Sequence, residues 1–200
     1  MTQSVGAGTV GEPLTAARAE RQLLAWVEST VVGLNLCPFA RPVVQGPGLR
    51  IAVCAADDSE AGLLLMRESL LRELDLLQSN SQDDIATTLL AFTGGLARFD
   101  DYLDFLDQAN ALLEAAGLEG VIQLASFHPD YQFAGEPPAA ASHFSNRAPL
   151  PVIHLLREDM LERALAAWPE PEKIPQVNIA RLNALGREEL AARLARLREL

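Results

Sequence analysis

Four short apolar runs alternate with segments of helical period along this chain, and this order limits its fold more than any other feature. The runs occupy residues 49–55, 86–92, 121–125 and 152–156, and their alternation or richness in strand-forming residues is typical of β-strands. Apolar residues between and around them recur every three or four positions, as in amphipathic helices. We therefore predict an α/β (or α+β) fold with about four mostly parallel or mixed strands, helices packed on the sheet, and a helical C-terminus.

Local signals place several helix ends. Thr15 and Ser59 precede helical patterns and are suited to cap them, and Gly117 follows a third pattern where a left-handed residue ends many helices. Two successive β-α-β units with right-handed crossovers would make the first three strands parallel if they share a sheet. The C-terminal segment from about Val177 is helical in pattern, and its apolar side is expected to pack on the domain or on a second copy in a homodimer.

Length and composition set the class of protein. Two hundred residues with 49% hydrophobic content predict a single globular domain over 14–200, preceded by a disordered tail at 1–13. The net charge of -11 repels phosphate backbones, so we expect no nucleic-acid binding. No apolar run approaches the ~20 residues of a membrane helix. Two cysteines and an N-terminus without a secretory pattern favour a cytoplasmic protein with reduced thiols.

The segment "SFHPDYQFAG" follows the third apolar run and opens a long irregular stretch at about 127–150. Ligands of open α/β sheets bind beyond the carboxyl ends of strands, and loops of this length are usually functional when they are ordered. The acidic excess of the chain falls in residues 57–119, whereas 120–157 is neutral and contains all three histidines. This stretch is therefore the predicted site.

His128 and Asp130 flank Pro129, which favours extended backbone at His128 and would turn both side chains to one side. The pair would suit acid–base catalysis, with Tyr131 as a supporting group, or metal binding. The alternative is structural: His128 satisfies a backbone carbonyl and Asp130 begins a turn. His154, inside the fourth run, is either a satisfied core residue, a further catalytic group, or a third ligand to a divalent metal beside His128 and Asp130. No role is assigned to His143.

Arg147 and Asn146 lie in the same loop, and an arginine fork matches a carboxylate or phosphate. Arg157 would join them in substrate binding only if the fold brings it near, and each arginine has a surface ion pair as its alternative role. Cys37 in "NLCPFARP" lacks a second cysteine for a C-x-x-C pair, and packing after a helix end is the favoured interpretation. The chain contains no nucleotide-binding or serine-hydrolase motif, and its single lysine argues against Schiff-base chemistry with pyridoxal phosphate.

The motifs "VVGLNLCPFA", "ASFHPDYQFAG", "SNRAPLPVIHLLRE" and "NIARLNALG" together resemble the bacterial domain-of-unknown-function family 1415 over about residues 19–186. The resemblance implies a stand-alone domain with no assigned activity. It also adds Asn35 to the candidate substrate-binding residues named above. The family pattern usually has tyrosine at the position of Phe144 and serine at that of Ala148, so hydroxyl chemistry is not expected at those two positions.

Two hypotheses follow for function. In the first, the protein is an enzyme that acts on a small anionic metabolite by His/Asp acid–base chemistry, with or without a metal, in a site formed by residues 127–150. In the second, the same loop is a non-catalytic surface that binds a ligand or a protein. A catalytic site requires His128, Asp130 and Arg147 to converge in a concave pocket. A binding surface would instead present aromatic side chains to solvent.

Overall fold

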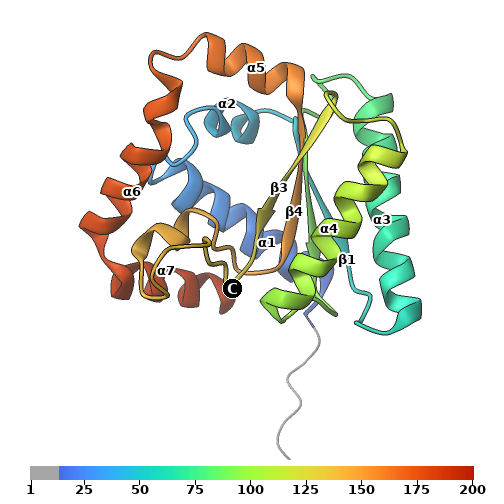
Figure 1. Ribbon diagram of the computed structural model, residues 1–200, viewed down its shortest axis with the longest axis horizontal. Helices are drawn as coiled ribbons and strands as arrows, with labels where there is room; N and C mark the ends of the chain where they lie inside the picture. Colours follow the sequence, from blue (N-terminus) through green and yellow to red (C-terminus); the bar gives the residue numbers. More distant parts are fainter. Residues whose placement is uncertain (1–13) are drawn as a thin grey trace, which may run out of the picture.

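The computed structural model describes residues 14–200, and its centre is one mixed four-stranded sheet in the order β1-β2-β4-β3 (Figure 1). The strands are β1 (Leu49–Cys54), β2 (Thr87–Phe92), β3 (Ile122–Phe127) and β4 (Val152–Arg157). β1 and β2 pair in parallel, and β4 is antiparallel to both β2 and β3. The predicted fold class is confirmed. The first three strands do run in one direction, but β4 separates β2 from β3.

Helices precede, separate and follow these strands. They are α1 (Ala16–Trp26), the π-helical η1 (Val27–Val32), α2 (Ala40–Gln45), α3 (Glu60–Ser79), α4 (Phe99–Ala115), the 3-10 turn η2 (Ala141–Ser145), α5 (Glu158–Ala166), the 3-10 turn η3 (Pro171–Lys173), α6 (Ile174–Leu185) and α7 (Arg187–Arg198). The sequence pattern did not distinguish the π-helical turn from the α-helix before it. Short α2 was also not predicted.

The predicted helix ends are observed. The Thr15 side chain accepts a hydrogen bond from the Arg18 N–H, and Ser59 Oγ accepts one from the Gly62 N–H at 3.1 Å. Both bonds satisfy amides that have no partner inside the helix. Gly117 has a φ of 69°, the left-handed conformation expected after α4.

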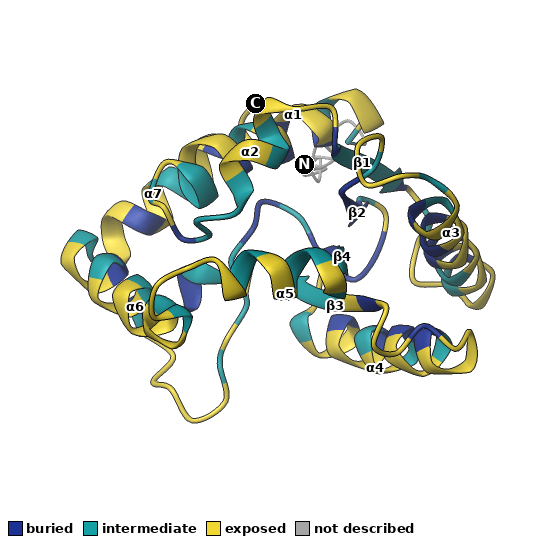
Figure 2. Cartoon of the chain, turned by 90° about the horizontal axis from the view of Figure 1, so that it is seen from above, coloured by how far each residue is buried: buried dark blue, intermediate teal, exposed yellow. Residues whose placement is uncertain are grey.

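Helices cover the two faces of the sheet separately (Figure 2). One face packs on α3 and α4 through the largest core cluster, which includes Leu70, Phe92, Phe105 and Ile153. The other face packs on α1 and η1 through Leu23, Trp26, Leu89 and Val152, and Leu197 of α7 joins this cluster. A third, smaller cluster joins α6 and α7 to η2. The apolar side of the C-terminal helix therefore packs within its own chain.

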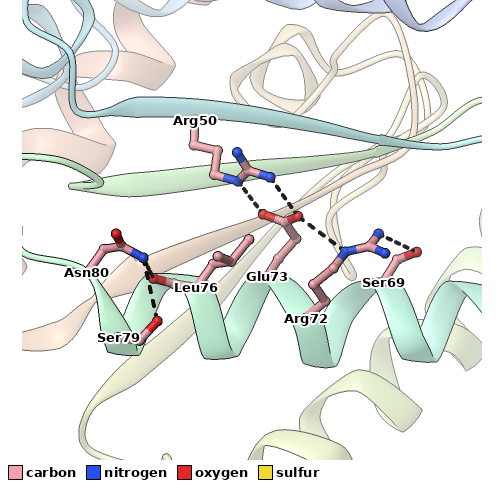
Figure 3. Close-up of polar contacts among 7 residues, drawn as sticks. All are labelled: Arg50, Ser69, Arg72, Glu73, Leu76, Ser79 and Asn80. Carbon is pink, nitrogen blue, oxygen red and sulfur yellow. Dashed lines mark hydrogen bonds and ion pairs between the residues drawn. The ribbon is translucent and has the colours of Figure 1, made fainter.

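A buried ion pair fixes α3 against β1 (Figure 3). Glu73 is 1% exposed, and its carboxylate accepts hydrogen bonds from Nε and Nη2 of Arg50 at 2.6 and 3.0 Å. Nε of Arg72 lies 3.9 Å from the same carboxylate. The hydrogen bond with Glu73 raises the pKa of Arg50, as the bidentate geometry requires. Arg50 therefore neutralises the negative charge of Glu73, which is the buried carboxylate of α3.

The hypothesis of a disordered tail at 1–13 lies outside the described residues. Within residues 14–200, no helix has the length and apolar character needed to cross a bilayer. Both cysteines are free thiols, as expected.

Candidate functional site

The loop at 127–150 is held by a histidine whose two ring nitrogens bind backbone atoms. His128 is fully buried; its Nδ1 accepts the Asp130 N–H at 3.0 Å, and Nε2 lies 3.0 Å from the Leu96 carbonyl oxygen. Because Nδ1 is an acceptor, the proton is on Nε2, which donates to Leu96. Burial lowers the pKa of His128 and favours this neutral form. The geometry is that of the structural alternative: His128 satisfies a carbonyl, and the Asp130 backbone, not its carboxylate, meets the ring.

His143 repeats this arrangement fifteen residues after His128. It is fully buried, its Nδ1 accepts the Phe133 N–H at 3.1 Å, and its Nε2 lies 2.9 Å from the Pro137 carbonyl oxygen. No role was predicted for this residue. The signal that points to it is the run of prolines around it, because a chain poor in amide donors needs side chains to satisfy its carbonyls.

Asn146 and Arg147 complete the support of the loop. Asn146 Nδ2 donates to the Ser126 carbonyl at 3.1 Å, and Arg147 Nε donates to the Tyr131 carbonyl at 3.1 Å. The Arg147 carbonyl in turn accepts the indole N–H of Trp26 at 3.0 Å. Asn146 and Arg147, which were predicted to bind an anion, thus each donate one hydrogen bond to the backbone.

Arg147 nevertheless keeps free donors. Its guanidinium lies 4.7 Å from the ring centroid of Phe144, and no acceptor within residues 14–200 pairs with Nη1 or Nη2. Neither atom belongs to the enclosed unpaired side-chain atoms of the described chain, which are Thr88 Oγ1 and Ser142 Oγ. Both terminal nitrogens of Arg147 therefore reach solvent.

The electrostatic surroundings of Arg147 are positive in a protein that is acidic as a whole. Burial lowers the pKa of Arg147, Asp130 opposes this effect, and Arg187 and Arg198 add to it. Neither Arg187 nor Arg198 has a carboxylate partner in the described part of the chain. Arg187 and Arg198 thus add to the positive charge that acts on Arg147, while Asp130 opposes it, and Nε of Arg198 is itself bonded to the Pro149 carbonyl at 3.3 Å.

A narrow hollow of about 10 Å³ opens beside this guanidinium, which is room for about one water molecule. Its lining comes from α1, η1, the loop and α7: Trp26, Thr30, Phe144, Arg147, Leu190, Arg193, Leu194 and Leu197. The charge of Arg193 is compensated by Glu189 at 2.7 Å. The hollow admits a single small polar group and no larger molecule.

Aromatic rings form the outer side of the loop. Tyr131 is half-buried, with its ring centroid 5.3 Å from that of Phe99 and 5.0 Å from that of Phe133, which is also half-buried. The Asp130 carboxylate is exposed beside them. The loop therefore presents part of two aromatic side chains and one carboxylate to solvent.

Arg157 lies at the opposite end of β4 from this loop. Its guanidinium donates to the carbonyl oxygens of Leu77, Asn80 and Ile85, with Asn80 at 2.7 Å. These carbonyls close the C-terminus of α3 and the entry to β2, where a positive charge also complements the helix dipole. The structure does not bring Arg157 to Arg147, and its donors serve the backbone.

Asn35 lies in a third place, at an open hollow of about 430 Å³ between the end of η1 and α6. It is exposed and has a φ of 48°, a left-handed conformation that asparagine tolerates better than most residues. Arg181 donates to the carbonyls of Leu34 and Asn35 at 2.7 Å each, and Asn178 donates to that of Leu36 at 2.7 Å. The motifs "NLCPF" and "NIARL" are therefore contact partners.

Cys37 follows this clamped turn and is half-buried at the start of α2. Burial raises the pKa of its thiol, and the amides of Phe39 and Ala40 only partly oppose that effect. A raised pKa keeps the thiol protonated, which is the opposite of what a reactive cysteine needs.

His154 lies on the sheet face that packs against α1. Its Nε2 is 2.6 Å from Thr87 Oγ1, and that hydroxyl donates its proton to the Leu155 carbonyl at 2.6 Å. Thr87 must therefore accept the N–H of Nε2, which leaves Nδ1 as an acceptor. Burial lowers the pKa of His154 to about 4, so the ring is neutral near pH 7.

The candidate metal set is not assembled. Residues 14–200 contain no group of three or more His, Cys, Asp or Glu side chains arranged to hold a metal ion. His128 has both nitrogens on the backbone, and His154 contacts Thr87 on the sheet. The three-ligand hypothesis for His128, Asp130 and His154 is therefore not supported by the geometry, because the strand and the loop direct these side chains to different surroundings.

These features define an α/β protein with a mixed four-stranded sheet and a loop held by two buried histidines. The sequence model of the family described as "Protein of unknown function (DUF1415)" matches residues 18–192, and the chain belongs to this family. No curated protein and no solved structure matches it.

Proposed function

We propose that this protein binds a small ligand through a carboxylate or phosphate group at Arg147, with α7 and the 127–150 loop as the two sides of the site. The observation that carries the proposal is the pair of solvent-accessible terminal nitrogens of Arg147, which have no acceptor among residues 14–200. A half-buried guanidinium gains most from an anion, because part of its hydration has already been removed.

The local charge supports the same conclusion. Arg187 and Arg198 act on Arg147 with no carboxylate of their own in the described chain, so an incoming anion meets a positive region on a protein of net charge -11. The adjoining hollow holds only one water-sized group. The body of the ligand would therefore lie outside it.

This proposal favours the binding alternative over acid–base catalysis. A general base must reach its substrate, whereas His128 is fully buried with both nitrogens engaged by Asp130 N–H and Leu96 O. The catalytic hypothesis would require His128 to leave both partners. It stays a prediction, as do the cytoplasmic location, the absence of nucleic-acid binding and a homodimer through α7.

The test is a titration of the full chain with inorganic phosphate and, separately, with succinate, followed by amide NMR at constant ionic strength set with sodium chloride. We expect saturable shifts at Tyr131 and Arg147. In Arg147→Gln, affinity should fall at least about tenfold, because one charge-assisted hydrogen bond contributes about 1.5–3 kcal/mol.

Arg163→Gln is the matched control, because it removes the same charge from an exposed pair with Asp159 on α5. Its affinity should equal that of the wild type. The proposal fails if neither anion produces more shift than chloride, or if both variants bind equally well.

A further inference from the structure

One half of the sheet face that carries His154 is incompletely covered. Strand register places Leu89 and Val152 on this face together with Ala125, Phe127 and His154. The first two are buried under α1 and η1, whereas the other three are only half-buried. The helices therefore cover this face of the sheet less completely at the edge strand β3 than at β2.

The helices around this half-face do not close it. In Figures 1 and 2, α2, α5, α6 and α7 form an arc on this side of the sheet. Neither α2 nor α5 contains a buried residue, and α6 contains one, Leu182. The rings of Phe39 and Trp168 meet at 5.7 Å and join the start of α2 to the segment after α5. The arc is thus connected at its rim, while α2 and α5 contain no fully buried residue.

His154 supplies the polar group of this half-face. Nδ1 has no hydrogen-bond partner within residues 14–200, and it is not one of the enclosed unpaired atoms, so it is open to solvent. Burial lowers the pKa of the imidazole to about 4, so the ring is neutral near pH 7. The Phe127 ring lies beside it, with the centroids 6.1 Å apart. An acceptor without a partner in the described chain thus lies beside half-buried apolar side chains.

We propose that this half-face of the sheet is a binding site for a small, neutral, mainly apolar molecule with an aromatic ring, which donates one hydrogen bond to Nδ1 of His154. The donor is required because Thr87 occupies the N–H of the imidazole, leaving only an acceptor. Neutrality follows because a charged molecule would be desolvated beside Ala125, Phe127 and Leu156 without an opposite charge from a neutral imidazole. An aromatic ring fits because it can pack against Phe127.

The polar group of this site differs from that of the site at Arg147, and the proposal does not rest on the proposed function. Arg147 takes part in the loop and contacts Phe144, whereas His154 contacts Thr87 and Phe127 on the strands. The ligand chemistry also differs, since one site offers only donors with positive charge and the other only a neutral acceptor.

Phenol and anisole are a matched pair of probes, because they share the ring and differ in the hydrogen-bond donor. We expect millimolar phenol to shift the amide resonances of Ala125, Phe127 and His154 in the wild-type chain. Anisole should bind up to about tenfold more weakly, as expected for one lost hydrogen bond. In His154→Phe, which keeps an aromatic ring and removes the acceptor, phenol should lose its advantage over anisole.

Equal affinity of the wild type for the two probes would overturn the proposal, as would shifts confined to other parts of the chain or no shifts at all. If His154→Phe does not fold, acylation by diethyl pyrocarbonate replaces it, because this reagent attacks accessible neutral imidazole nitrogens. His154 should react, His128 and His143 should not, and phenol should slow the reaction. Reaction at an unchanged rate in the presence of phenol would count against the site.

Discussion

At the scale of single residues, similar side chains have different roles that depend on which backbone atoms surround them. Arg147 and Arg157 are both partly buried and both belong to the loop-and-strand motif of the family. Arg157 meets three carbonyls at a helix end, while Arg147 meets one and keeps its terminal nitrogens free. The residue type alone therefore does not predict which of the two arginines supports the backbone and which keeps free donors.

Replacement of Arg157 by methionine tests its structural role. The carbonyls of Leu77, Asn80 and Ile85 would lose their donor, and a charge-assisted hydrogen bond contributes about 1.5–3 kcal/mol. We therefore expect the free energy of unfolding, measured with urea, to fall by about 2–3 kcal/mol.

Arg163→Met is the control for this measurement, since Arg163 makes an exposed ion pair on α5. Its cost should stay below about 1 kcal/mol. An equal loss in the two variants would mean that the Arg157 contacts contribute no more than a surface pair.

For the histidines too, residue type alone does not predict which backbone atoms the side chain contacts. The sequence predicted that His128 lies at the end of the third strand, and it offered a carbonyl contact as one of two roles. It gave no reason to distinguish His143, which has the same pair of backbone contacts. The choice depends on which carbonyls lack amide donors after folding, and that is a property of the loop path.

At the scale of elements, the contact between α6 and the turn after η1 joins residues that are 142 to 147 positions apart in the chain. Asn178 and Arg181 hold the carbonyls of residues 34–36, directly before Cys37. Residues of "NIARL" thus hold the backbone of "NLCPF", and we expect the burial of the Cys37 thiol to depend on this contact.

Asn178→Ala should loosen that turn and expose Cys37. We expect the thiol to react with Ellman's reagent several-fold faster than in the wild type, because local opening limits access to a half-buried group. Cys54, which is 7% exposed inside the sheet, should remain protected in the same sample.

Asn110→Ala is the matched substitution, since Asn110 donates only within α4 to the Leu106 carbonyl. It should leave the reactivity of Cys37 unchanged. The assigned role of α6 would be wrong if Asn178→Ala reacted no faster than Asn110→Ala.

At the scale of the whole molecule, buried neutral histidines make the fold sensitive to moderately acidic pH. Burial lowers the pKa of His154 from 6.5 to about 4 and also lowers that of His128. Between these values the unfolded chain binds more protons than the folded chain, so the free energy of unfolding decreases as pH falls from about 6.5 to 4.

We expect the His154 contribution to this loss to be on the order of 2 kcal/mol, allowing for the partial exposure of the ring. Urea unfolding at several pH values measures it, and His154→Gln should flatten the slope between pH 6.5 and 4. Carboxylates with lowered pKa, such as Asp159 with an ordinary value of 3.8, contribute only at the acidic end of this window and below it, and they are common to both chains. A stability that is constant from pH 6.5 to 4 would contradict the prediction.

The sequence by itself determined the order of strands and helices, the caps at Thr15 and Ser59, the left-handed residue Gly117 and the fold class, because local periodicity and backbone preference decide these features. It also directed attention to residues 127–150. Only the tertiary structure decided that β4 lies between β2 and β3, that Arg157 is far from Arg147, and that the nitrogens of His128 are engaged while Nδ1 of His154 is open. These outcomes depend on contacts between distant segments, and no local pattern encodes which carbonyl a folded chain leaves without a donor.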